Sequence, residues 1–100
     1  MLPQARKPTT PGEILKEEFL TPLGMTQQEL ADATGISRVR VNNIVNGKRS
    51  ITPDTAFRLA RFFDTTPEFW MSLQMSVDLW TAGEENRRAY SRIHPVTPRV

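Results

Sequence analysis

Basic and amide side chains concentrate between residues 38 and 49 of this 100-residue chain, and they are of the types that read DNA. Arginine can make paired hydrogen bonds to guanine, asparagine can make them to adenine, and valine can contact the methyl group of thymine. No acidic residue occurs between positions 33 and 53, while segments 10–32 and 54–86 are net acidic. A basic window in an acidic frame suits a phosphate-facing surface, so we interpret this stretch as a candidate DNA-binding surface.

Two short helices joined by a tight turn, within residues 26–46, are predicted to position these side chains. Thr26 and Glu29 have the spacing of a capping box, which starts a helix. Gly35 suits the left-handed conformation that ends this helix, and Ser37 suits the N-cap of the next one. The pattern is typical of a helix-turn-helix, whose second helix lies in the DNA major groove. An ordinary αα-hairpin in a small helical domain is the alternative.

The second of these helices is predicted to have one buried and one exposed face. Val41 and Ile44 are expected to face the core, together with Ile36 as an apolar plug in the turn. The side chains expected to face outward are Arg38, Val39, Arg40, Asn42, Asn43 and Asn46. Arg38 and Asn43 are our candidates for contacts with base edges. The candidates for phosphate contacts are Arg40, Asn42, Lys48 and Arg49, with a solvated surface as the alternative for the last two. Single-stranded RNA binding fits less well, because exposed aromatic residues are missing near the basic window.

The remaining sequence predicts an all-α domain. The first helix is expected to end at Pro22 and Gly24, with Leu23 and Met25 as core residues near its end. The fourth helix carries the apolar spacing of an amphipathic helix. Three helix starts are marked by a threonine, a proline and an acidic residue close together, at residues 10–13, 52–54 and 66–68.

The fifth helix is predicted to be apolar on more than one side. A stripe of large apolar residues is complemented by others around the helix, which is more apolar surface than a small domain can cover. We therefore predict a homodimer interface, with a purely intramolecular core as the alternative. The residues of this predicted interface are Trp70, Leu73, Val77 and Trp80. We divide the chain into a flexible arm (1–9), the helix-turn-helix domain (10–82) and a polar, basic extension (83–100).

Composition argues against several classes of protein. The chain has no cysteine, hence no disulfide and no cysteine-based metal site, and no apolar run approaches the roughly 20 residues that span a membrane. Lacking a secretory signal as well, it is expected to be cytoplasmic. The acidic pairs Glu17-Glu18 and Glu84-Glu85 point about 100° apart on a helix, and His94 has no plausible partner. We therefore expect no enzyme, catalytic residue, metal, cofactor or small-molecule substrate.

Residues 11–74 resemble the HigA-type antitoxins of bacteria. The distinctive motifs are the opening PGEIL…EFL…PLG, the loop NGKRSIT and the segment PEFWMSLQ. HigA-type antitoxins belong to the Xre, or lambda-repressor-like, helix-turn-helix class and include proteins known as virulence-associated protein I. The resemblance implies a five-helix, all-α, lambda-repressor-like domain that dimerises, which agrees with the expected extension of helix 5.

The resemblance also implies a function. HigA-type proteins are antitoxins of type II toxin–antitoxin modules: they bind a palindromic operator, repress their own operon and neutralise a HigB toxin, a RelE-like mRNA endonuclease. In the repressor class, the start of the second helix and the outer face of the third contact DNA, with Gln27 here expected to hold a phosphate. By position the DNA-contacting residues are Gln27, Ser37, Arg38, Val39, Arg40, Asn42 and Asn43. Thr34 departs from the pattern, which commonly has a more apolar residue there. The alternative is a free-standing Xre-family repressor with no toxin partner.

Overall fold

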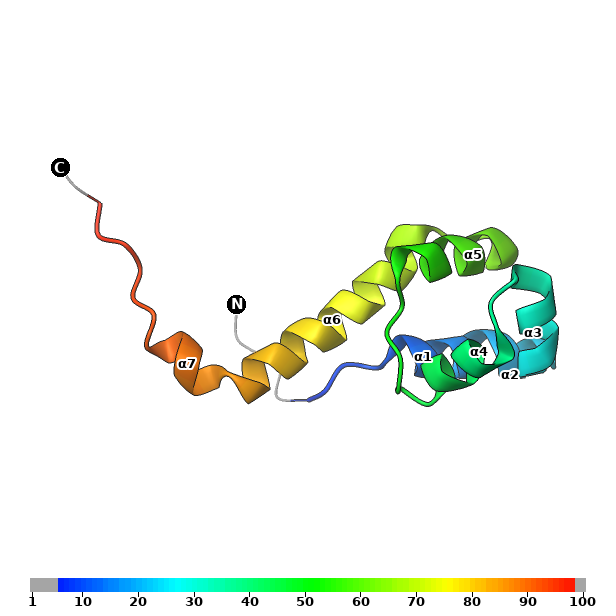
Figure 1. Cartoon of the computed structure of the whole chain (residues 1–100), viewed down its shortest axis with the longest axis horizontal. Helices are drawn as coiled ribbons and strands as arrows, with labels where there is room; N and C mark the ends of the chain where they lie inside the picture. Colours follow the sequence, from blue (N-terminus) through cyan, green and yellow to red (C-terminus); the bar gives the residue numbers. More distant parts are fainter. Residues whose placement is uncertain (1–5, 99–100) are drawn as a thin grey trace.

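The computed structural model describes residues 6–98, which form helices and connecting loops with no β-strand among them (Figure 1). The first helix runs without a break through α1 (Pro11–Ile14), the π-wound segment η1 (Leu15–Leu20) and α2 (Thr21–Leu23). The later helices are α3 (Gln27–Thr34), α4 (Arg38–Val45), α5 (Pro53–Phe63), α6 (Pro67–Glu85) and α7 (Arg87–Ser91). The predicted all-α fold with five principal helices is confirmed, and the short α7 is an addition. Residues 1–5 of the predicted arm lie outside the described residues.

Four of the helix starts use the threonine caps that the sequence predicts. The side chains of Thr10, Thr26, Thr52 and Thr66 each accept a hydrogen bond from the backbone N–H three residues later. Each cap satisfies one of the N–H groups that have no partner inside the helix, which is worth about 1 kcal/mol. Local sequence therefore specifies where these helices begin.

The end of the first helix agrees with the prediction at Gly24 but not at Pro22. Pro22 lies inside α2, and the helix ends at Gly24, whose φ of 61° is left-handed. The N–H of Thr21 donates to the carbonyl of Lys16, five residues back, as in a π turn. This wider winding accommodates a proline, because proline has no N–H to donate and its ring crowds the preceding turn.

The turn at Gly24 also overturns the prediction that Leu23 is a core residue. Leu23 is 61% exposed, whereas Met25 packs against the core. The N–H of Met25 donates to the carbonyl of Leu20 at 2.9 Å, which folds the chain back and directs Met25 inward. The core itself joins all five principal helices, and its largest completely buried side chains are those of Trp70, Leu15, Leu30, Leu59, Val41 and Thr55.

Helix α6 is the longest helix and extends away from the rest of the domain toward α7 (Figure 1). The prediction that Trp70 belongs to a dimer interface is wrong, because this side chain is 0% exposed in the chain's own core. Its indole N–H donates to Thr65 Oγ1 at 2.9 Å, so its polar atom is also satisfied within the chain. Leu73 is half-buried and packs against the same core, while Val77 and Trp80 are half-buried farther along α6.

Candidate nucleic-acid interface

Helices α3 and α4 form the predicted helix-turn-helix. Thr26 Oγ1 accepts from the N–H of Glu29 at 3.1 Å, and Glu29 Oε1 accepts from the N–H of Thr26 at 3.0 Å, so the capping box is confirmed. Gly35 ends α3 with φ 75°, and Ser37 caps α4 by accepting from the N–H of Arg40. Ile36 is buried in the turn, as predicted. These local interactions fix the direction in which α4 leaves the turn.

Arg58, on α5, holds the end of α3 and was not predicted. Its Nη1 donates to the carbonyl oxygen of Thr34 at 2.9 Å, and its Nε pairs with Asp54 at 3.0 Å. The first bond satisfies one of the carbonyls that a helix C-terminus leaves without a partner. Thr34 itself is half-buried, and its hydroxyl donates to the carbonyl of Leu30 at 2.7 Å. The polar group at this atypical position is therefore satisfied locally.

The start of α4 has an unusual charge for a helix N-terminus. The four helices capped by threonine each carry an acidic residue in the first turn, which complements the positive end of the helix dipole. Helix α4 has none there and carries Arg38 and Arg40 instead. Backbone N–H groups and two cations therefore meet at one end of α4. Such a concentration of positive charge is suited to an anion such as a DNA phosphate.

The outer face of α4 presents most of the predicted contact residues to solvent. Val41 and Ile44 are buried beneath it, as predicted. Val39 is 69% exposed. Arg40 and Asn43 are half-buried, and the exposed members of the set are Ser37, Arg38, Val39 and Asn42.

Three amide side chains are linked along this surface. Asn42 Nδ2 donates to Gln27 Oε1 at 3.1 Å, and Asn46 Nδ2 donates to Asn42 Oδ1 at 3.2 Å. The first bond joins α3 to α4 across fifteen positions of the sequence. Gln27 and Asn42 were predicted separately as phosphate contacts, and the structure brings them together.

The basic loop after α4 is anchored by a buried residue of α6. Gln74 Oε1 accepts from the N–H of Ile51 at 2.8 Å, and Gln74 Nε2 donates to Asp78 at 2.8 Å. Gln74 was not predicted, although a polar residue between Trp70 and Val77 on an apolar stripe was a signal of a specific partner. Lys48 and Arg49, within this loop, are both exposed.

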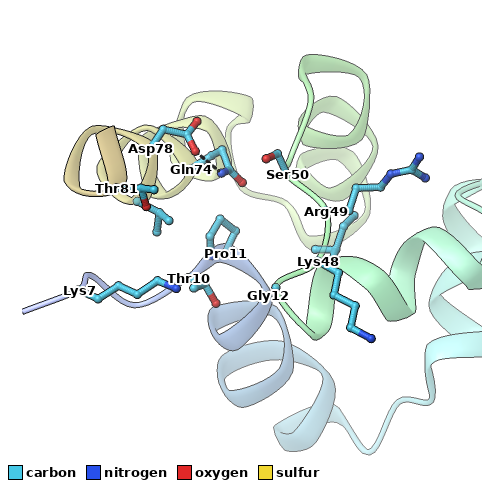
Figure 2. Close-up of a pocket in the computed structure, with 13 residues that line it drawn as sticks. Lys7, Thr10, Pro11, Gly12, Lys48, Arg49, Ser50, Gln74, Asp78 and Thr81 are labelled. Atoms are coloured by element: carbon cyan, nitrogen blue, oxygen red, sulfur yellow. Dashed lines mark hydrogen bonds between the residues drawn. The ribbon is translucent and has the colours of Figure 1, made fainter. Parts of the chain in front are cut away.

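A cavity of about 240 Å³ lies between this loop, the start of α1 and α6 (Figure 2). Its lining includes Thr10, Ser50, Gln74, Val77 and Thr81. Lys48 and Arg49 also line this cavity, and the charged ends of their side chains extend away from it (Figure 2). The loop therefore directs its positive charge outward from the domain.

The close contact between the first helix and α4 was also missed by the sequence reasoning. A Cβ atom on Gly12 would overlap the carbonyl oxygen of Ile44 and would lie 2.9 Å from the carbonyl oxygen of Val45. Only glycine permits the start of the first helix to pack directly on the last turn of α4. This contact determines how closely the last turn of α4 approaches the first helix.

Between positions 6 and 98, no group of three or more His, Asp or Glu side chains is arranged to hold a metal ion. None of the helices in this range is long and apolar enough to cross a membrane.

Known proteins are similar to this chain in sequence and in architecture. Residues 15–70 match the model of the family described as helix-turn-helix. Antitoxin HigA-1 of Vibrio cholerae is 47% identical over 75 residues, which are 75% of this chain and 70% of the relative. Virulence-associated protein I of Dichelobacter nodosus is 41% identical over 87 residues, covering 87% of this chain and 80% of the relative. The solved structure of Pseudomonas aeruginosa antitoxin HigA with the higBA promoter is 42% identical, with a TM-score of 0.86, and covers 90% of this chain and 99% of that one.

Proposed function

The chain belongs to the helix-turn-helix family and resembles its HigA-type antitoxins, and from this premise we propose that it is a DNA-binding antitoxin that represses its own operon. The observation that carries the proposal is the capped, outward-facing α4, which has cations and no acid in its first turn. The Pseudomonas aeruginosa antitoxin HigA, solved with the higBA promoter, covers nearly the whole of this architecture and supports DNA binding by this chain.

In this proposal α4 enters the major groove and the surrounding residues hold the DNA backbone. Arg38 and Asn43 contact base edges, and the exposed Val39 can contact a thymine methyl group. Their neighbours position the helix on the duplex without reading its sequence. The positioning residues are Gln27, Ser37, Arg40, Asn42, Lys48 and Arg49. The hydrogen bond between Gln27 and Asn42 supports their assignment to one phosphate-facing group, because both amides are already held together.

The operator in this proposal is palindromic and is bound by a homodimer formed through α6. Met75 and Leu79 are 57% and 67% exposed on α6, which supports an interface beyond the core of one chain. With Trp70 removed from the predicted interface, Leu73, Val77 and Trp80 remain on one side of α6, and Met75 and Leu79 add exposed apolar surface on its other side. Such a dimer presents two copies of α4 about 34 Å apart, one turn of DNA.

As an antitoxin, the proposed protein binds a partner protein, a HigB-like mRNA endonuclease. The resemblance to HigA-1 of Vibrio cholerae and to other antitoxins supports this partner. The free-standing repressor remains the alternative, because it would use the same α4 surface without a toxin. The two are distinguished by the partner alone.

Two measurements test the proposal. In an electrophoretic mobility-shift assay, the chain is expected to bind the region upstream of its own operon more tightly than scrambled DNA of the same length. In co-expression with the product of the neighbouring gene, which this proposal expects to be a small basic protein, the chain is expected to elute as a complex in size-exclusion chromatography. Specific DNA binding without a complex would favour the free-standing repressor. Equal binding to both DNAs would contradict operator recognition.

A further inference from the structure

Four phenylalanine rings, from η1, α5 and α6, form a continuous aromatic surface. The ring centroids of Phe62 and Phe63 lie 4.9 Å apart, those of Phe63 and Phe19 lie 4.6 Å apart, and those of Phe19 and Phe69 lie 6.4 Å apart. None of the four side chains is fully buried, and Phe62 and Phe69 are 38% and 37% exposed. We call these four residues the phenylalanine patch. Phe19 and Phe63 also pack against the buried core, so Phe62 and Phe69 are the exposed members of the patch.

The charges around the phenylalanine patch are opposite in sign to those around α4. Five charged residues lie within two positions of its members in the sequence, and four of the five are acidic. They are Glu17, Glu18, Asp64 and Glu68, with Arg61 as the one base in this window. The bases one helical turn away are Lys16 and Arg58, of which Arg58 is paired with Asp54. The ion pairs found between positions 6 and 98 are Arg58–Asp54 and Arg87–Glu84, so these four carboxylates are not neutralised by a salt bridge there. The patch is therefore apolar at its centre, and the residues near it in the sequence include more unpaired acids than unpaired bases.

Asp64 occupies its position against two local preferences. It ends α5 with φ 56° and ψ 46°, and it is the one non-glycine residue of the described chain with positive φ. Glycine is preferred in this conformation, and three glycines adopt it elsewhere in the described chain. A carboxylate at a helix C-terminus also faces the negative end of the dipole. Aspartate adopts this conformation more readily than most side chains, but glycine would be the more stable residue here.

We infer that the phenylalanine patch and its acidic surround, with Asp64 among them, are the docking surface for a basic protein partner, the toxin. This inference rests on the proposed function. An enzyme that cleaves mRNA must attract RNA phosphates and therefore carries a positively charged surface. A protein of that kind complements the acids at the rim, while its apolar residues cover the exposed phenylalanine rings at the centre.

The charge of the patch argues against two other occupants, which are DNA and a second copy of this chain. DNA is repelled by four unpaired carboxylates. A second copy of this chain, docked patch to patch about a two-fold axis, would bring the same acids together. Because the patch involves neither α3 nor α4, its partner can bind while α4 remains available to DNA.

The test uses the full-length chain and the small basic protein encoded by the neighbouring gene, with affinity measured by biolayer interferometry. Phe62→Ala and Phe69→Ala are each expected to weaken the complex about tenfold, since each removes an aromatic contact from its centre. Asp64→Asn keeps a residue that tolerates the left-handed conformation and removes only the charge. It is expected to slow association and to reduce the salt dependence of binding. Asp64→Gly is expected to weaken the complex while leaving the melting temperature unchanged or higher.

The controls are residues of the same type elsewhere on the surface. Phe57 is 64% exposed on α5 and makes no ring contact with the patch, so Phe57→Ala is expected to leave the complex unchanged. Glu85→Gln at the end of α6 is the matched charge control for Asp64→Asn. Operator binding by every variant reports that the domain is folded.

Each outcome decides the inference. Loss of the complex in the patch variants, with operator binding retained, supports it. A wild-type complex that the patch variants retain would overturn the docking surface while the proposed antitoxin function stands. A change in the oligomeric state of the isolated patch variants would assign the surface to a second copy and overturn the inference. If the wild-type chain forms no complex, both the toxin-binding part of the proposed function and the docking surface are overturned. Operator binding is then judged from the mobility-shift assay alone.

Discussion

At the scale of single residues, Arg38 and Asp64 are placed where helix dipoles disfavour them. Arg38 begins α4, where the other capped helices carry an acid, and Asp64 ends α5 in a left-handed conformation. Natural proteins accept unfavourable local choices mainly where function requires them. The two residues lie on different surfaces of opposite charge, which agrees with one face for DNA and another for a basic protein.

Replacing Arg38 tests whether α4 reads base edges. Arg38→Ala is expected to cost about 1–3 kcal/mol in binding to the operator and to relax its sequence preference. The melting temperature should not fall, because the removed cation opposes the dipole of its own helix. Fluorescence anisotropy on operator and scrambled DNA measures the effect, with Arg88→Ala on α7 as the control. An equal loss on both DNAs would assign Arg38 to the phosphates instead.

Replacing Lys48 tests the role of the basic loop. Lys48→Ala is expected to weaken binding to all DNA sequences and to reduce the slope of log K against log salt by about one. A titration repeated at several salt concentrations provides that slope, and Lys16→Ala on η1 serves as the charge-matched control. An unchanged slope would mean that Lys48 is simply a solvated side chain.

At the scale of elements, the position of α4 depends on the glycine beneath it. Gly12→Ala forces a methyl group into the carbonyl oxygens of Ile44 and Val45, and we expect it to destabilise the domain by about 1–3 kcal/mol and to weaken operator binding. Gly83→Ala is the matched control, because a Cβ there meets no atom within 4 Å. Since alanine favours a helix interior, that variant should be stabilised by about 0.5–1 kcal/mol. Thermal denaturation compares the two, and equal effects would disprove the close contact.

At the scale of the whole molecule, operator binding depends on how two chains associate. Helix α6 extends beyond the domain, and the molecule measures 59 × 26 × 21 Å (Figure 1). Leu79→Glu and Trp80→Glu are each expected to yield a monomer with weakened operator binding, because a carboxylate would be buried between two apolar helices. Analytical ultracentrifugation gives the molecular mass directly. A dimer that persists in both variants would place the interface elsewhere.

The sequence by itself determined the elements whose signals are local. The capping box at Thr26 and Glu29, the left-handed Gly35 and the cap at Ser37 were all predicted, because each joins residues three or fewer positions apart or concerns a single backbone conformation. Helical periodicity likewise identified the buried Val41 and Ile44. The family resemblance was available from motifs such as PEFWMSLQ.

Only the tertiary structure decided what covers each apolar face and which distant residues meet. Periodicity showed that the stripe containing Trp70 is apolar, but not that the chain's own core encloses this residue. The bond from Arg58 to Thr34 spans 24 positions, and the bond from Ile51 to Gln74 spans 23. Contacts of this kind depend on how helices cross in space, and the composition of one helix does not encode the position of another. The exposed face of α4 could therefore be predicted from the sequence. The contacts that hold α4 in place, and the phenylalanine patch, could be identified only in the folded chain.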